Sequence, residues 1–198
     1  MTTPYLFHID KLTHGPIQSL THHWSAGVHW LCGDEGSGKT TLLRLLSGDL
    51  QPTVGSVHMP EGGVFWVDLQ DAAHDPTTVQ TCWAALRERY PTWRDDLQHD
   101  LSQELGMTPH LDKRLNMLSA GSRRKVMVIA ALASGATVTL LDQPFAALDR
   151  VSIQLVLDFL HEAADHPHRA WVVADYEVPE DLPVTSVLHL AAVGPASN

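Results

Sequence analysis

The chain alternates short runs of consecutive apolar residues with longer stretches in which apolar residues recur at helical spacing. The apolar runs predict strands over residues 27–33, 62–69, 137–142, 170–175 and 186–193. Helical spacing occupies residues 40–48, 77–90, 92–107, 122–135 and 152–166, with Gly48 as a C-terminal helix cap. Strands that alternate with helices favour an α/β fold, built on a mostly parallel sheet with covered faces.

The segment 76–118 departs from this alternation, because it is mainly helical and lies between two strands. Its position predicts a helical subdomain inserted into a single domain that comprises residues 1–198.

Composition and charge narrow the classes of protein that fit this pattern. Hydrophobic residues make up 44% and charged residues 18% of the chain, as in ordinary globular proteins. The formal net charge of -10 argues against a nucleic-acid-binding surface. No window approaches 18 apolar residues, and the N-terminus lacks the pattern of a signal peptide. Cys32 and Cys82 are too few for a disulfide framework, which suits a reducing cytoplasm. Because no window is apolar enough to span a membrane, any membrane role would come through a partner.

A glycine-rich loop between a predicted strand and a predicted helix carries the strongest chemical signal. It fits the pattern G-x-x-x-x-G-K-[ST], whose glycines let backbone N–H groups converge on phosphate oxygens. The lysine supplies a point charge for the β- and γ-phosphates, and the hydroxyl that follows it binds magnesium. The loop therefore predicts nucleotide binding by Gly33, Asp34, Glu35, Gly36, Ser37, Gly38, Lys39 and Thr40, with Thr41 as the next hydroxyl.

Three further motifs follow the phosphate loop in a fixed order. The segment 118–122 reads LSAGS and, taken alone, would be an ordinary helix start capped by Ser119. It precedes an apolar strand that ends in Asp142, and the tripeptide Ala147-Leu148-Asp149 comes soon after. Together with the phosphate loop, these motifs resemble those of the ATP-binding cassette (ABC) ATPases over nearly the whole chain.

The resemblance implies a P-loop NTPase fold with an N-terminal antiparallel β portion, and ATP and Mg²⁺ as ligands. Asp142 matches the aspartate that supports magnesium beside Thr40. Gln70 matches the glutamine that touches magnesium and the attacking water. Ser119 and Gly121 match the signature that binds the γ-phosphate of ATP held by the opposite subunit. His14 stands where the family often has an aromatic residue that stacks on adenine.

Two positions on the nucleotide face depart from the family pattern, and the signature has Ala120 and Ser122 for the usual glycine and glutamine while it keeps Ser119 and Gly121. Gln143 stands where the family usually has a glutamate that acts as general base, and Asp175 stands where it has a switch histidine. An amide orients water but cannot accept a proton at neutral pH, and loss of a positioned base costs about 10²–10⁴ in rate. An anion near the γ-phosphate repels it. This chain's own site is therefore expected to bind ATP but to hydrolyse it slowly.

The retained signature and the altered nucleotide site together favour a heterodimer, in which this chain completes the active site of a second ABC ATPase subunit. One alternative is a homodimer that hydrolyses slowly. Another is that Gln143 is a substitution introduced to trap the ATP-bound state, which leaves Asp175 unexplained.

The leading function is the ATP-binding subunit of a transporter, cytoplasmic and peripheral on the inner face of the membrane, with membrane subunits as partners. The resemblance extends to compact bacterial transporter ATPases, in which Trp83, Tyr90 and Trp93 would line the groove that receives a membrane subunit. The alternative for these three is an ordinary core. The alternative function is a non-transport ABC protein that acts as a nucleotide-gated binding module.

Two histidine clusters and one basic run carry weaker signals. His22-His23 and His166-Pro167-His168 lack a Cys or carboxylate partner at metal-ligand spacing. The basic run 122–125 is expected to face solvent or acidic neighbours.

Overall fold

The computed structural model describes residues 5–68 and 71–191. Its contacts divide the chain into two compact units, and the chain passes between them several times. The first unit contains residues 1–66, 137–143 and 158–198, and the second contains residues 67–136 and 144–157.

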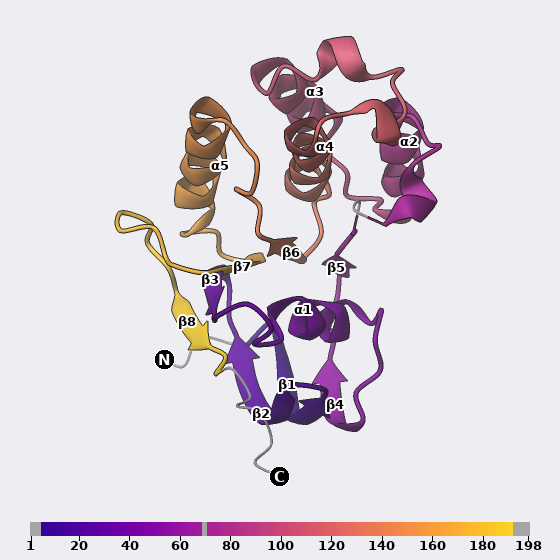
Figure 1. Cartoon of the computed structure of the whole chain (residues 1–198). Coiled ribbons are helices and arrows are strands. Elements are labelled where there is room, and N and C mark those ends of the chain that lie inside the picture. Colours follow the sequence, from indigo (N-terminus) through magenta and orange to yellow (C-terminus); the bar gives the residue numbers. More distant parts are fainter. Residues whose placement is uncertain (1–4, 69–70, 192–198) are drawn as a thin grey trace. The chain divides into compact units, whose positions relative to one another are not determined.

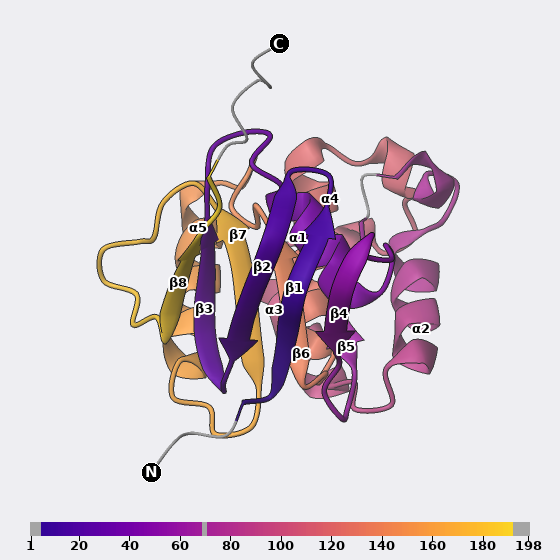
Figure 2. The same ribbon diagram turned by 90° about the horizontal axis from the view of Figure 1, so that it is seen from below.

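The first unit contains a three-stranded antiparallel sheet in the order β2-β1-β4 (Figure 2). Its strands are β1 (Phe7–His14), β2 (Ile17–Trp24) and β4 (Val54–His58). One face of this sheet is apolar and buried, and there the rings of Phe7 and Trp24 stack with centroids 4.6 Å apart.

A second sheet in the same unit is entirely parallel, in the order β5-β6-β7-β3-β8. Its strands are β3 (Gly27–Cys32), β5 (Val64–Phe65), β6 (Val138–Asp142), β7 (Ala170–Asp175) and β8 (Ser186–His189). The parallel sheet confirms the expected fold class. The strand expected over 62–69 is shorter than predicted, because β5 pairs with β6 on one side only and Gly62 and Gly63 both have positive φ.

Helix α1 (Lys39–Ser47) lies between the two sheets (Figure 1). Its leucines fill the core together with residues from both sheets: Leu42, Leu43, Leu45 and Leu46 are at most 1% exposed. Gly48 ends the helix in the left-handed conformation with φ 85°, as the sequence predicts. Because α1 begins directly after the phosphate loop, this packing holds the loop in place.

The second unit is helical, with α4 packed against both α2 and α3 (Figure 1). The helices are α2 (Val79–Arg89), α3 (Asp95–Glu104) and α4 (Ala120–Ala133), with short 3-10 turns at Ala72–His74, Thr108–His110 and Leu115–Met117. Trp83 and Tyr90 are buried, and the Trp83 indole N–H donates to the carbonyl of Val126 at 3.1 Å. These two aromatics are therefore core residues of the unit, the second of the two alternatives, while Trp93 is half-buried.

Helix α5 (Arg150–Ala163) begins in the second unit and ends in the first. In the first unit the rings of Phe159 and Trp171, which lies on β7, pack in a T-shaped arrangement with their centroids 6.0 Å apart.

Candidate functional site

The phosphate loop connects β3 to α1, and its glycines are required by close approaches of other groups. Gly38 has φ 100°, and a Cβ there would lie 2.8 Å from the ring of Pro16. A Cβ on Gly33 would lie 2.4 Å from the hydroxyl of Ser37 and 2.8 Å from the carbonyl of Leu190. A carbon atom does not approach other atoms this closely, so a side chain at either position would displace its neighbours, and glycine fits both.

Lys39 is the first residue of α1 and is only 5% exposed. Its ammonium donates to the carbonyls of Gly33 at 2.5 Å and Asp34 at 3.0 Å. It also lies over the ring of Tyr176, 4.7 Å from the ring centroid. A buried cation is thus held at the mouth of the loop by two carbonyls and an aromatic ring, where phosphate oxygens would find it.

Thr40 and Asp142 meet although they are far apart in the sequence. The Thr40 hydroxyl donates to Oδ2 of Asp142 at 2.6 Å, and Asp142 is the last residue of β6. A hydroxyl and a carboxylate in contact, next to a phosphate loop, are oxygen ligands of the kind that Mg²⁺ takes together with substrate phosphates. The residues present therefore fit the ion that the sequence predicts.

A cavity of about 310 Å³ opens over the phosphate loop. Gln143, at the position of the general base, lines the same cavity as the lysine and the hydroxyls. The cavity is lined by Pro16, Asp34, Glu35, Gly36, Gly38, Lys39, Thr40, Thr41 and Gln143.

Gln143 and Asp175 lie at the carboxyl ends of neighbouring parallel strands. Gln143 has a left-handed backbone with φ 44°, and its N–H donates to the carbonyl of Ala174 at 2.8 Å. Asp175 ends β7, and its Oδ1 accepts the N–H of Tyr176 at 2.8 Å. Asp175 itself does not line the 310 Å³ cavity.

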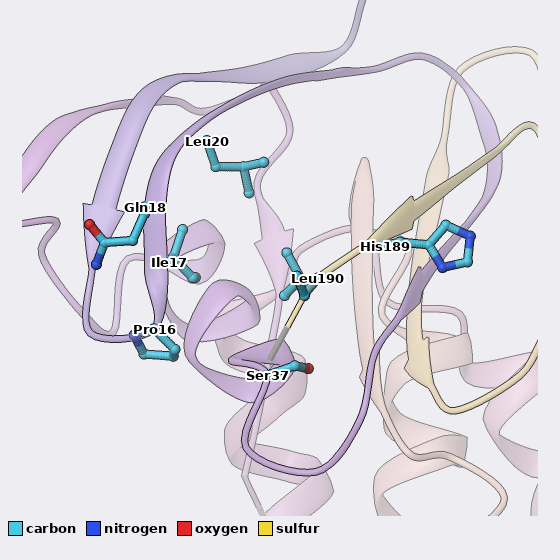
Figure 3. A pocket seen from close by; sticks show the side chains of 8 residues that line it. Pro16, Ile17, Gln18, Leu20, Ser37, His189 and Leu190 are labelled. Atoms are coloured by element: carbon cyan, nitrogen blue, oxygen red, sulfur yellow. The ribbon is translucent and has the colours of Figure 1, made fainter. Parts of the chain in front are cut away.

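A second cavity, of about 260 Å³, adjoins the first, since Pro16 lines both. It lies between the start of β2, the phosphate loop and the end of β8 (Figure 3). Ile17, Leu20 and Leu190 give it an apolar wall, and Gln18, Ser37 and His189 give it polar groups. Apolar walls with a few polar groups are typical of surfaces that accept flat organic rings.

His14 lines neither of these two cavities; its Nδ1 is 3.4 Å from the hydroxyl of Thr53. Stacking of its ring on a base stays a prediction. Gln70 lies outside the described residues.

Ser119 and Gly121 lie in the second unit, at the start of α4. The Ser119 hydroxyl accepts the N–H of Ser122 at 3.1 Å and so caps the helix, which the sequence suggests. Gly121 approaches the chain again at Ala147, because a Cβ on Gly121 would lie 2.4 Å from the Ala147 carbonyl oxygen. The signature segment and the 147–149 tripeptide are therefore packed directly on each other.

Charged residues reinforce this packing in the second unit. The Lys125 ammonium lies 2.8 Å from Oδ2 of Asp149, and the Ser152 hydroxyl also donates to that carboxylate. The hydrogen bond from Lys125, and after it those from Ser152, lower the pKa of the Asp149 carboxyl. Arg123 pairs with Asp75 at 2.6 Å. The basic run therefore meets acidic neighbours, as expected.

Lys39, Thr40 and Gln143 line one cavity, and Asp142 is joined to it through its hydrogen bond with Thr40. Sequence reasoning missed Tyr176 and Pro16. Nothing in their local sequence marks them, since each becomes a site residue only through its contact with the loop.

Within residues 5–68 and 71–191, no helix is long and apolar enough to cross a bilayer. The same ranges contain no group of three or more His, Cys, Asp or Glu side chains arranged to hold a metal ion.

Comparison with known sequences gives many relatives of one kind. The family model described as "ABC transporter" matches residues 21–146. The chain is 28% identical to the molybdenum import ATP-binding protein ModC of Brucella suis, over 85% of this chain and 51% of that protein. It is 31% identical to the cytochrome c biogenesis ATP-binding export protein CcmA of Pseudomonas syringae, over 79% and 78% of the two chains. The chain spans about half the length of the first of these relatives.

Solved structures agree with the fold. A putative ABC transporter ATP-binding protein from Pyrococcus furiosus aligns with a TM-score of 0.72 at 23% identity, covering 93% of this chain and 96% of that one. A bacterial Atm1-family ABC exporter with ATP bound aligns with a TM-score of 0.73 at 18% identity, covering 96% of this chain and 38% of that one. At these identities the likeness shows the arrangement of the elements.

Proposed function

Because the chain belongs to the ABC transporter family, we propose that it is the ATP-binding subunit of a membrane transporter whose own site binds ATP but hydrolyses it slowly. The observation that supports this proposal is the cavity over the phosphate loop, which joins a buried lysine and a Thr40–Asp142 pair to an amide at Gln143. Lys39, Thr40 and Asp142 are suited to binding a nucleotide with its magnesium, and the Gln143 amide is the wrong group for hydrolysing it.

Binding follows from the chemistry of the loop. Lys39 and the backbone N–H groups of the loop neutralise phosphate charge, and the dipole of α1 adds to their effect. Thr40 and Asp142 would hold Mg²⁺, which supplies charge neutralisation to the β- and γ-phosphates when bound. The apolar wall of the second cavity, or the ring of His14, would accept the base.

Slow hydrolysis follows from Gln143. Its amide can hydrogen-bond to a water but cannot take the proton that the water must lose. The carboxylate of Asp175, at the end of the neighbouring strand, adds a negative charge where the family has an imidazole.

The partners follow from the two units taken separately. The family resemblance assigns Ser119 and Gly121 to ATP held by another subunit. The packing of Gly121 on Ala147 and the Lys125–Asp149 pair, which hold this segment in the second unit, support that role. We propose a second, fully equipped ABC ATPase as the partner in a heterodimer. Membrane subunits would complete the transporter at the inner face of the membrane.

Nucleotide binding and turnover by the chain, compared with Gln143→Glu, test this proposal. The unaltered chain should bind MgATP with very low turnover, and the variant should hydrolyse it at least about 100-fold faster, within the range that a general base contributes. ATP binding is measured by calorimetry and phosphate release by a coupled assay.

The matched control is Gln51→Glu, the same change at an exposed position outside the cavity, which should leave turnover unchanged. Turnover by the unaltered chain alone at about 10 s⁻¹, an ordinary enzyme rate, would contradict the slow site. Recovery of ribosomes or nucleic acid instead of a polytopic membrane protein on co-purification would contradict transport.

A further inference from the structure

The ring of Tyr176 faces the phosphate-loop lysine although it belongs to a different part of the chain. Tyr176 follows β7 directly, and the Lys39 ammonium lies 4.7 Å from its ring centroid. The side chain is 51% exposed, and its hydroxyl makes no hydrogen bond within the part of the chain that the structure describes. A large aromatic ring therefore lies against the phosphate-loop lysine, with its hydroxyl free to bond.

The surroundings of Lys39 show how the ring and a phosphate can share the ammonium. An ammonium has three N–H donors, and the carbonyls of Gly33 and Asp34 occupy two of them. The ring accepts the remaining side of the charge through its face. A hydrogen bond from an ammonium to an anionic oxygen is stronger than its contact with a ring face, so an incoming phosphate oxygen can take over this donor while the ring stays beside the lysine.

The backbone of Tyr176 is fixed independently of the ring. Its N–H donates to the Asp175 carboxylate at 2.8 Å. In the parallel sheet the backbone of Asp175 lies opposite that of Cys32, the last residue of β3, immediately before the phosphate loop. The side chain of Tyr176 is thus anchored at this strand end, against the lysine that would contact the β- and γ-phosphates.

We propose that Tyr176 is the residue of this chain that recognises the γ-phosphate, its phenol O–H donating to a γ-phosphate oxygen where the imidazole of the family is missing. The inference rests on the proposed ATP binding. A phenol O–H is a hydrogen-bond donor, so it supplies the hydrogen bond that the Asp175 carboxylate cannot. ADP lacks the γ-phosphate and cannot use the contact, so Tyr176 makes the site selective for ATP.

The test compares Mg²⁺-dependent affinities for ATP and ADP by calorimetry in the full chain and in Tyr176→Phe. The variant keeps the ring over Lys39 and loses only the hydroxyl. We expect its ATP affinity to fall about tenfold, or about 1.4 kcal/mol, with ADP affinity within twofold of the unaltered chain. Tyr5→Phe is the matched control, because Tyr5 is also exposed in the first unit but its ring packs on His23.

A second variant separates hydroxyl from ring. Tyr176→Leu removes both, so ATP selectivity should fall as far as in Tyr176→Phe, whatever happens to both affinities together. An unchanged ratio of ADP to ATP dissociation constants in Tyr176→Phe overturns the role of Tyr176 and leaves nucleotide binding intact. Failure of the unaltered chain to bind either nucleotide overturns the proposed function and this inference with it.

Discussion

Two carboxylates stand in the phosphate loop itself, where they oppose the charge of the lysine. Asp34 and Glu35 are exposed and line the cavity that Lys39 and Thr40 also line. Their negative charge acts against phosphate through solvent, so each contributes a small and salt-dependent repulsion. At the residue scale, the backbone of the loop thus favours phosphate binding, and the carboxylates of Asp34 and Glu35 weaken it.

Glu35→Gln should therefore bind MgATP about two- to fivefold more tightly at low ionic strength, in keeping with the modest energies of exposed charge pairs. The gain should shrink toward zero at about 1 M salt, where the Debye length is about 3 Å. Titrations at two salt concentrations measure this.

Glu61→Gln provides the matched control, since it removes the same charge from an exposed position outside the cavity. A gain in affinity of equal size in both variants would assign the effect to net charge rather than to the loop.

At the element scale, the start of α4 and the 144–157 segment form one packed structure through Gly121. Replacing a helical glycine by alanine ordinarily stabilises a helix by about 1 kcal/mol. Here the added Cβ would lie 2.4 Å from the Ala147 carbonyl oxygen, in a backbone that cannot swing aside as a flexible side chain would. The overlap should outweigh the gain in helix propensity.

Gly121→Ala is therefore expected to lower the free energy of unfolding by about 1–3 kcal/mol, the usual cost of overpacking. Urea unfolding followed by circular dichroism measures the change. Ser122→Ala, one residue further on, should change stability by no more than about 0.5 kcal/mol. A Gly121→Ala variant more stable than the unaltered chain would rule out the close contact.

At the scale of the whole molecule, buried histidines make stability depend on pH. His29 in β3 is 2% exposed and is satisfied as a neutral ring, with Nε2 2.9 Å from the Ser25 carbonyl and Nδ1 2.8 Å from the Ser186 hydroxyl. Burial, opposed by the Ser25 hydrogen bond, lowers the pKa of His29. Burial likewise lowers the pKa of His22 and His166 in the same unit.

A histidine with a lowered pKa in the folded state is protonated first in the unfolded chain. Its contribution to stability is present above the ordinary pKa of about 6.5 and is lost as the pH falls through the lower folded value. For His29 the limiting slope is about 1.4 kcal/mol per pH unit.

The melting temperature should therefore fall between pH 7.5 and pH 5.5, and it should fall less in His29→Gln, which has no titrating ring. Scanning calorimetry at both pH values measures this. His99→Gln is the control, because His99 is exposed on α3 in the other unit. A pH dependence of the melting temperature that is the same in His29→Gln and the unaltered chain would remove His29 as its source.

Local patterns determined much of this protein. The phosphate loop was predictable from its letters alone, because its function comes from consecutive backbone N–H groups and a helix that starts directly after it. The helices and the strands of the parallel sheet followed from apolar patterns, and Gly48 from its place after the last apolar position, whereas β1, β2 and β4 were expected only from the family resemblance. Gln143 was recognisable as the altered residue because it directly follows the aspartate that ends an apolar strand.

Contacts between distant residues were decided only by the tertiary structure. Parallel strands bring their carboxyl ends together, which is how Asp142 reaches Thr40 and how Tyr176 reaches Lys39. No local pattern encodes that choice, because many strand orders suit the same apolar runs. The tertiary structure also decided between a groove and a core for Trp83 and Tyr90. The sequence is compatible with both, and in the structure both side chains are buried in the core. The sequence determined that a phosphate would be bound, and the packing of the strands decided which side chains would face it.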